Sequence, residues 1–241
     1  MSPDPAVHTV ATGTHGRYLV DAPAGAGPWP VLMGFHGYAE TAAIHLEALA
    51  RLDPAHAWLR VSAQGLHRFY TRAQHVVASW MTREDRALAV ADNLAYAAAV
   101  RAAIRRDYAT TAPLVMVGFS QGAAQAYRAG LAAGDACAGI LVLGGDLPPD
   151  VAADAGALPP VLIGRGRDDP WYSFAQLAAD RERLAAAGAS FSVCEFDGAH
   201  EWADLFVEAG AAWLSTRRSE QGVVTRRARS RQPDAPPAPR P

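Results

Sequence analysis

Cysteine, lysine and long apolar runs are scarce or absent in this sequence of 241 residues. The two cysteines, Cys137 and Cys194, both lie in apolar stretches, so we expect buried reduced thiols and no disulfide framework. No unbroken run of about 18 apolar residues occurs, which predicts that no segment spans a membrane. Because C-x-x-C, H-E-x-x-H and clustered Cys/His spacings are missing, the sequence predicts neither a metal site nor a cofactor. Met1 to Thr14 lack the basic start and apolar core of a secretory signal, and we expect a cytoplasmic protein.

Basic residues are all arginine and are concentrated at the C-terminal end. Residues 217–241 contain seven arginines and two acidic residues, so they carry a net charge of +5, and the rest of the chain carries −7. The Pro-rich end of this tail predicts disorder. A basic tail can contact nucleic acid or an anionic membrane. The simpler hypothesis is a solvated extension with no specific partner.

The rest of the chain, residues 1–216, has the composition of one well-buried domain. Half of all residues are apolar and 19% are charged, and the length is too short for two domains of ordinary size. Apolar, strand-like runs alternate with helical stretches. Strands are predicted at 7–12, 16–21, 31–35, 57–62, 113–119, 139–143, 161–164 and 191–196, helices at 42–52 and 86–106, and an irregular loop at 64–83. The first two strands are expected to form a hairpin at the sheet edge. This alternation predicts an α/β fold with a mostly parallel sheet, helices on both faces and ligands beyond the carboxyl ends of the strands.

The most informative stretch runs from Pro113 to Gly122 and ends in Gly-Phe-Ser-Gln-Gly. An apolar run that leads into G-x-S-x-G and then into small residues is typical of a nucleophile elbow, a strand that turns sharply into a helix. Ser120 would then stand exposed at the turn, and Gly118 and Gly122 would be needed because a side chain there would crowd it. The alternative is an ordinary tight turn, since such a motif occurs by chance.

A second strand tip carries His36-Gly37-Tyr38. In serine enzymes with a nucleophile elbow, the loop after such a strand supplies one backbone N–H that binds the oxyanion, and the residue after the serine supplies another. We assign these two N–H groups to Tyr38 and Gln121. His36 is interpreted as the residue that orients the loop rather than as a catalytic base.

An attacking serine needs a base, and the base needs an orienting acid. His200 is the only histidine after the elbow and follows a predicted strand, so it is the predicted base. Asp146, Asp168 and Asp169 all follow strands of the same sheet, and each is a candidate for the acid. The chain order of serine, aspartate and histidine matches the order found in enzymes with this elbow.

Five motifs occur in order along the chain: His36-Gly37, Gly118 to Gly122, Gly144 to Pro148, Gly166-x-x-Asp169-Pro170 and Gly198 to Glu201. Together they resemble the phospholipase/carboxylesterase and acyl-protein thioesterase family of α/β-hydrolases, over roughly residues 16–216. The resemblance implies an α/β-hydrolase fold, and its His-Gly-x-x-Asp pattern places the acid at Asp169. The sequence departs from the family at Arg165, where the family has histidine, and at Trp171-Tyr172, where small apolar residues are usual.

We therefore expect a cofactor-independent serine hydrolase that cleaves small carboxylic esters or thioesters. Ser120 is the predicted nucleophile, His200 the base and Asp169 the acid. The chain has no spare residues for a separate cap domain, so access to Ser120 should be open.

Aromatic residues near the predicted strand tips are candidate substrate contacts. They are Phe69, Trp80 and Trp171, with Tyr38 beside them. A dienelactone-hydrolase-like or peptidase-like enzyme would share the same fold, because fold does not fix function. A non-catalytic protein recruited by its basic tail is the more distant alternative.

Overall fold

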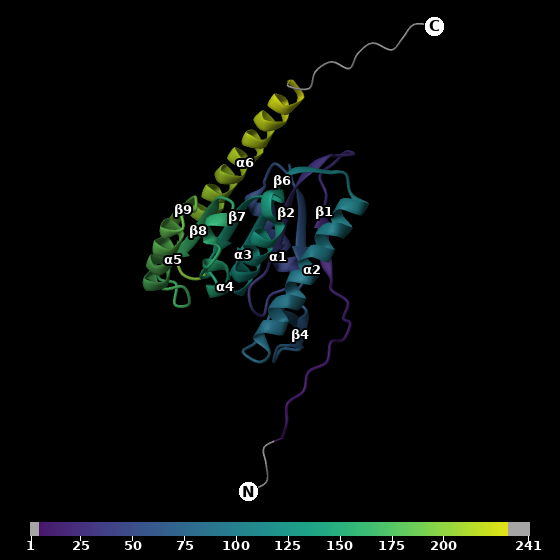
Figure 1. The fold of residues 1–241 in the computed structure, drawn as a ribbon, viewed down its shortest axis with the longest axis vertical. Helices are drawn as coiled ribbons and strands as arrows, with labels where there is room; N and C mark the ends of the chain where they lie inside the picture. Colours follow the sequence, from purple (N-terminus) through teal and green to yellow (C-terminus); the bar gives the residue numbers. More distant parts are fainter. Residues whose placement is uncertain (1–4, 231–241) are drawn as a thin grey trace, which may run out of the picture.

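A seven-stranded sheet forms the centre of the computed structural model, which describes residues 5–230, without the side chains of 220–230 (Figure 1). Its strand order is β1-β3-β2-β6-β7-β8-β9. The strands are β1 (Tyr18–Asp21), β2 (Trp29–Phe35), β3 (Leu59–Ala63), β6 (Thr110–Phe119), β7 (Cys137–Leu143), β8 (Val161–Gly166) and β9 (Phe191–Phe196). All neighbouring strands are parallel except β1 and β3. The predicted mostly parallel sheet is therefore confirmed.

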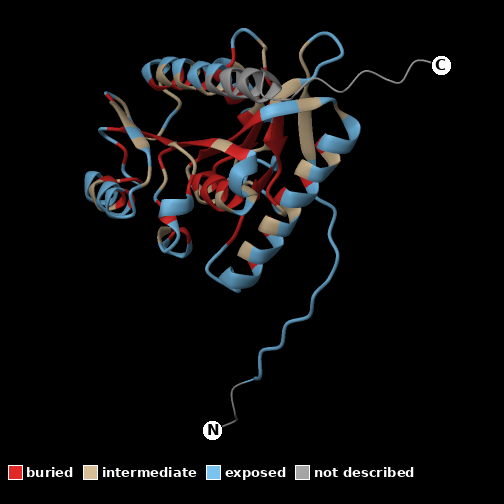
Figure 2. Cartoon of the chain, turned by 45° about the horizontal axis from the view of Figure 1, so that its top comes forward, coloured by how far each residue is buried: buried red, intermediate tan, exposed pale blue. Residues whose placement is uncertain are grey.

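Helices cover both faces of this sheet, as the sequence predicts. One hydrophobic cluster joins the sheet to α1 (Ala42–Leu52) and α6 (Asp204–Ser230). The other joins it to α2 (Arg86–Asp107), α3 (Gln121–Ala133) and α5 (Phe174–Ala186). The short elements α4 (Pro149–Ala152), η1 (Gly134–Ala136) and η2 (Ala155–Ala157) complete the connections. Figure 2 shows the buried strands enclosed by helices whose outer sides are exposed.

The central strands are continuous apolar runs because both of their faces are buried. Along β7, Ile140 and Val142 belong to one cluster and Leu141 between them to the other, and all three are 0% exposed. A strand alternates its side chains between the two faces, so a strand covered on both sides needs apolar residues at every position. Because β2, β3, β6, β7, β8 and β9 run parallel, the loops that follow them lie at one edge of the sheet.

The opening hairpin predicted from the sequence is wrong. Only β1 forms, and it pairs antiparallel with β3 at the sheet edge. Residues 7–12 form no strand, and Val7 and Val10 are 86% and 88% exposed. Two isolated apolar side chains bury too little surface to hold a strand against the sheet.

The irregular loop predicted at 64–83 is also wrong, because it contains a second, two-stranded sheet. β4 (His67–Tyr70) and β5 (Val76–Ser79) pair antiparallel, with His67 opposite Ser79. The turn between them is closed by a 2.9 Å hydrogen bond from the Thr71 amide to the His75 carbonyl oxygen. The hairpin is tied to the main body by the hydrogen bond from the Ala39 amide to the Ala78 carbonyl oxygen.

The boundary predicted at residue 217 does not coincide with an end of secondary structure. The backbone of α6 continues as helix to Ser230, past the predicted start of the tail, and the division into a domain and a tail at residue 217 stays a prediction. The Pro-rich end, residues 231–241, lies outside the described residues, and its disorder stays a prediction.

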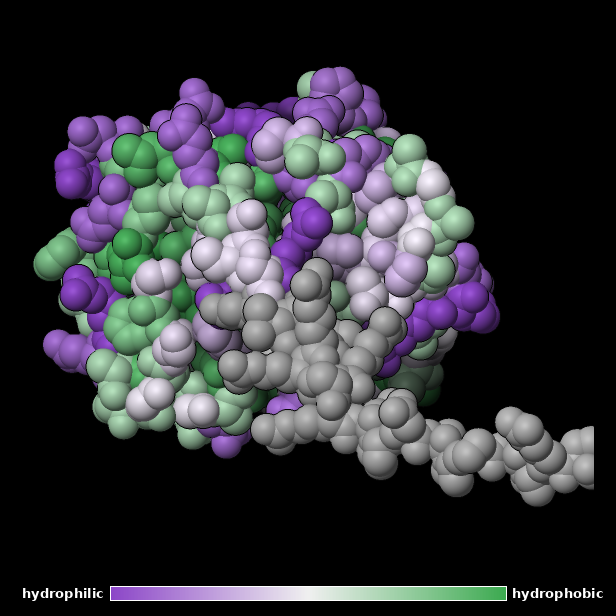
Figure 3. All heavy atoms as spheres, turned by 90° about the horizontal axis from the view of Figure 1, so that it is seen from above, coloured by the Kyte–Doolittle hydropathy of each residue, from purple (hydrophilic) through white to green (hydrophobic). Residues whose placement is uncertain are grey.

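Figure 3 views the molecule from above, where hydrophilic and apolar residues are interspersed over the described surface.

α2 is the one helix in the described residues that is long and apolar enough, by length and composition alone, to cross a membrane. In the structure its inner side packs on the sheet through Ala97, Val100 and Ile104. The test takes length and composition alone, so it does not show that α2 enters a membrane.

Both cysteines are free; Cys137 is buried, as predicted, whereas Cys194 is half-buried. The Cys137 Sγ lies 3.2 Å from the Gly139 carbonyl oxygen, to which it donates a hydrogen bond. Burial raises the pKa of the Cys137 thiol to about 11, so it stays protonated and unreactive.

His45 on α1 is completely buried, with its ring against Gly34 of β2. Burial lowers the pKa of His45 to about 3. An unfolded histidine has a pKa near 6.5, so between pH 3 and 6.5 the unfolded chain binds more protons and stability rises with pH. Lowering the pH from 7 to 5 should therefore cost about 2 kcal/mol at this residue.

We expect His45→Leu to flatten the pH dependence of the unfolding free energy by about that amount. Urea unfolding at pH 5, 6 and 7 measures it. His8→Gln is the matched control, because His8 is exposed and should keep the wild-type slope. A slope in His45→Leu equal to that of wild type would contradict the assignment.

Candidate active site

Ser120 stands at the junction of β6 and α3 in a strained backbone conformation, with φ of 52° and ψ of −120°. A positive φ is rare for residues other than glycine and costs of the order of 1–3 kcal/mol. The turn is held by hydrogen bonds from the Ser120 amide to the Leu143 carbonyl oxygen (2.8 Å) and from the Ala123 amide to the Ser120 carbonyl oxygen (3.0 Å). A Cβ at Gly118 would lie 2.4 Å from the Gly122 carbonyl oxygen, so the first glycine of the motif is required.

Asp169 and His200 meet at the carboxyl edge of the sheet. The His200 Nδ1 lies 2.8 Å from Asp169 Oδ2. The other oxygen, Asp169 Oδ1, accepts hydrogen bonds from the amides of Trp171 (2.8 Å) and Tyr172 (2.9 Å). The Asp169 side chain is 1% exposed, so this carboxylate is fixed in one orientation with its second oxygen facing the imidazole.

The two alternative acids lie elsewhere. Asp168 is exposed, with its amide bonded to the Gly198 carbonyl oxygen, and Asp146 is exposed on the cleft beside Ser120. Neither makes a hydrogen bond to His200 in the described part of the chain. Of the three aspartates that the sequence leaves open, Asp169 is the one whose carboxylate faces the imidazole.

The imidazole of His200 lies against the elbow. Its ring centroid is 4.9 Å from that of Phe119, the residue before Ser120. A Cβ on Gly144 would lie 2.8 Å from His200 Cε1, and a Cβ on Gly145 would lie 2.6 Å from the Ser120 carbonyl oxygen. The glycines after β7 therefore let the serine turn and the histidine approach the same point. The described residues show no hydrogen bond between the Ser120 hydroxyl and His200, a contact that is often long in serine enzymes before substrate binds.

His36 holds the loop after β2. It is 0% exposed, its Nδ1 donates to the Gly37 carbonyl oxygen (2.6 Å), and its Nε2 accepts from the Gly65 amide (2.9 Å). Burial lowers the pKa of His36, which keeps the ring neutral. Because both ring nitrogens are occupied, this histidine orients the loop, in line with the interpretation from the sequence.

The backbone N–H groups of Tyr38 and Gln121 lie where the loop after β2 meets the first turn of α3. A Cβ on Gly122 would lie 2.0 Å from the Phe35 carbonyl oxygen, which shows how closely the two segments approach. Within the described residues, neither N–H group donates to a backbone carbonyl oxygen. The Gln121 side chain is fixed separately, since Oε1 accepts from the Trp80 amide (2.9 Å). The Gln121 N–H opens α3 and the Tyr38 N–H belongs to the loop after β2, and free backbone N–H groups of this kind suit an anionic oxygen.

The predicted aromatic contacts divide into exposed and buried residues. Tyr38 is 60% exposed and stacks on Phe69 with ring centroids 5.6 Å apart, and Trp171 is 73% exposed on the cleft beside Ser120. The prediction for Trp80 is wrong, because its side chain is 0% exposed. Its Nε1 donates to the His36 carbonyl oxygen (2.8 Å), so Trp80 supports the loop after β2 from within the core.

The cleft beside Ser120 has a volume of about 340 Å³. Besides Trp171, its lining includes Met81, Arg86 and Asp146, so it offers both apolar and charged groups. Met81 and Arg86 are not among the predicted contacts, although Met81 lies in the loop predicted at 64–83 and Arg86 begins the helix after it. In the described part of the chain, no group of three or more His, Cys, Asp or Glu side chains could hold a metal ion.

Sequence reasoning also missed Glu40 as a member of this site. Its Oε2 accepts a 2.7 Å hydrogen bond from the Gly37 amide, which closes the loop that carries Tyr38. Burial raises the pKa of Glu40, while the hydrogen bond from Gly37 and the charge of His200 oppose that rise. The only sequence signal is its position three residues after Gly37, the spacing of a side chain that closes a turn.

The comparisons with known proteins give similarity in fold. No family model matches the chain, and no curated protein is similar to it in sequence. Among solved structures, the esterase PE8 is 22% identical, with a TM-score of 0.64 over 84% of this chain and 98% of the esterase. A carboxylesterase of Bacillus cereus is 19% identical, with a TM-score of 0.63 over 84% of this chain and 94% of that chain. Acyl-protein thioesterase 2 of Zea mays is also 19% identical, with a TM-score of 0.62 over 84% of this chain and 99% of the thioesterase. At such identities the likeness shows architecture, and this chain has the α/β-hydrolase fold.

Proposed function

We propose that this protein is a serine hydrolase that cleaves carboxylic esters or thioesters, with Ser120 as nucleophile, His200 as base and Asp169 as orienting acid. The observation that carries the proposal is the 2.8 Å contact between His200 and Asp169, on an imidazole that packs beside the strained Ser120 turn. The solved structures of similar fold include a carboxylesterase and an acyl-protein thioesterase, which supports the ester or thioester class.

In the first half of the reaction, the Ser120 oxygen attacks the substrate carbonyl carbon and its proton passes to His200 Nε2. Asp169 accepts the Nδ1–H hydrogen bond, which fixes the tautomer and stabilises the imidazolium. The N–H groups of Tyr38 and Gln121 donate to the oxyanion. When the tetrahedral intermediate collapses, the bond to the leaving oxygen or sulfur breaks and His200 returns its proton to that atom.

The second half releases the acid. Water gives a proton to His200 and attacks the acyl carbon, and the bond to Ser120 breaks as the proton passes to the serine oxygen. The free carboxylic acid leaves, and Ser120 and neutral His200 are regenerated. No residue outside the described site is needed for either half.

The finer assignment, to a divergent member of the phospholipase/carboxylesterase family, is supported by how the chain accommodates its departures. Arg165, in the place of the family's histidine, is buried, and its Nε donates to the Tyr172 carbonyl oxygen (2.8 Å). The Tyr172 hydroxyl in turn donates to Asp180 Oδ2 (2.9 Å), which also accepts from the Leu147 amide. This buried chain of hydrogen bonds supports the backbone that holds Asp169.

Reaction with a fluorophosphonate probe, followed by intact mass, tests the proposal. Wild type should gain one adduct, Ser120→Ala none, and His200→Ala should react at least about 10³-fold more slowly. Ser192→Ala is the matched control, because Ser192 is an exposed serine on β9 and should leave labelling unchanged. A folded wild-type protein that stays unlabelled, or that is labelled at another residue, would overturn the assignment.

A further inference from the structure

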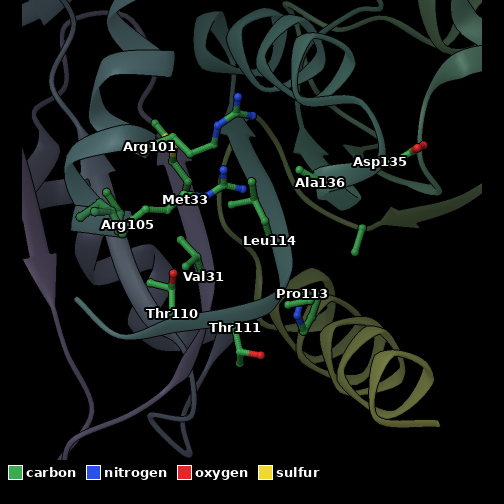
Figure 4. A pocket seen from close by; sticks show the side chains of 14 residues that line it. Val31, Met33, Arg101, Arg105, Thr110, Thr111, Pro113, Leu114, Asp135 and Ala136 are labelled. Atoms are coloured by element: carbon green, nitrogen blue, oxygen red, sulfur yellow. The ribbon is translucent and has the colours of Figure 1, made fainter. Parts of the chain in front are cut away.

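A second cavity, of about 260 Å³, lies at the opposite edge of the sheet from Ser120. It is bounded by the beginnings of β2, β6 and β7 and by the last turns of α2 (Figure 4). None of its lining residues is shared with the cleft beside Ser120. The two sites are therefore separate, and what this cavity binds does not depend on the proposed hydrolase activity.

The floor of this cavity is apolar and its wall is cationic. Val31, Met33 and Leu114 line it from β2 and β6, and all three side chains are largely buried, with Met33 1% exposed. Arg101 and Arg105 stand one turn apart on α2, and Figure 4 shows both guanidinium groups directed into the cavity. A small ligand with an apolar body and an anionic end would match both surfaces.

The two guanidinium groups lack counterions within the described residues. Neither Arg101 nor Arg105 makes an ion pair or hydrogen bond there, whereas their neighbour Arg106 pairs with Asp107 at 2.7 Å. Like charges four residues apart on a helix repel, and the helix C-terminus offsets only part of that cost. Asp135, the acidic residue of the lining, is exposed on η1 and lies across the cavity from both arginines in Figure 4.

We propose that this cavity binds a small organic carboxylate with a short apolar body. The carboxylate lies between Arg101 and Arg105, because the planar guanidinium group presents paired N–H donors that match two carboxylate oxygens. The carbon chain rests on Val31, Met33 and Leu114. The volume is slightly below that of common ligand pockets, which restricts the body to a short chain.

Methyl NMR of ¹³C-methionine protein, titrated with hexanoate, tests the proposal on the full chain. The sequence has four methionines, and each cavity holds a different one. Met33 lines this cavity, and Met81, which lines the cleft beside Ser120, is the reference. Hexanoate should shift the Met33 signal saturably, and hexanol should do so at least about tenfold more weakly because a charge-assisted hydrogen bond is lost.

Substitutions on α2 separate this site from general effects. The double variant Arg101→Gln/Arg105→Gln should weaken hexanoate binding, measured at the Met33 signal, at least about tenfold. Arg105→Gln alone should weaken it less. Because Arg105 is exposed, its replacement should not disturb folding. Arg106→Gln, on the same helix but outside the lining, should bind hexanoate like wild type. An unmoved Met33 signal, equal binding of hexanol, or unchanged hexanoate affinity in the double variant would overturn the proposal. If inorganic phosphate bound as tightly as hexanoate, the proposal that the ligand has an apolar body would be wrong.

Discussion

Replacing Ser120 by alanine is expected to lower kcat for an ester substrate by at least about 10⁴-fold. Without the hydroxyl oxygen no acyl-enzyme forms, and only polarisation of the carbonyl by the proposed oxyanion donors, the N–H groups of Tyr38 and Gln121, remains. Initial rates with p-nitrophenyl butyrate measure the loss, and His200→Ala should fall into the same range because serine and base act as one unit. Turnover by pure Ser120→Ala at the wild-type rate would remove the serine from the mechanism.

A companion variant separates chemistry from folding. Ser120→Gly should lose activity as Ser120→Ala does. It should also be more stable than Ser120→Ala by about 1 kcal/mol, because glycine adopts the observed φ of 52° without strain. For a domain of this size that corresponds to a rise in Tm of about 2–4 °C. Equal Tm values for the glycine and alanine variants would mean that the turn stores no strain.

The elbow and the histidine were predictable because each is specified locally. The G-x-S-x-G motif follows an apolar run, and His200 is the only histidine after it. The choice among the aspartates depended on resemblance, since the direction of a side chain in a turn depends on backbone bonds that the sequence does not display. Here the Asp169 amide donates to the Gly166 carbonyl oxygen, and two following amides fix its carboxylate.

The residues that were misplaced depend on contacts between distant parts of the chain. Trp80 lies in the loop predicted at 64–83, and nothing near it in sequence shows that Phe35 and His36 pack against its ring. The β4–β5 hairpin lacks a Gly-containing turn signal, and its pairing depends partly on the bridge between Glu40 and Ala78. Arg101 and Arg105 look like solvated helix residues until the sheet edge beneath them is in place. Sequence periodicity therefore predicts the sheet and the helices that cover it. The residues that hold the loops of the site in place are determined by tertiary packing and cannot be predicted from periodicity.

Replacing Gly122 by alanine is expected to damage both stability and catalysis. The added Cβ would lie 2.0 Å from the Phe35 carbonyl oxygen and 2.6 Å from that of His36, and these are backbone atoms that cannot turn aside. Overpacking of this kind costs about 1–3 kcal/mol or more. The loop after β2 must move away from α3, which takes the Tyr38 N–H out of reach of the oxyanion. Loss of one such donor lowers kcat by about 10²–10³-fold.

Urea unfolding and steady-state kinetics on Gly122→Ala measure the two effects, with rates taken per folded protein. Gly13→Ala is the matched control, because a Cβ there meets nothing within 4 Å and should change neither quantity. The two parts of the expectation test different contacts: reduced stability reports the approach of β2 to α3, and reduced kcat reports whether that approach positions the oxyanion donor. Reduced stability with an unchanged kcat would therefore support the close packing of β2 and α3 but contradict a role for the loop after β2 in the oxyanion hole. Gln121 would then be the single assigned donor.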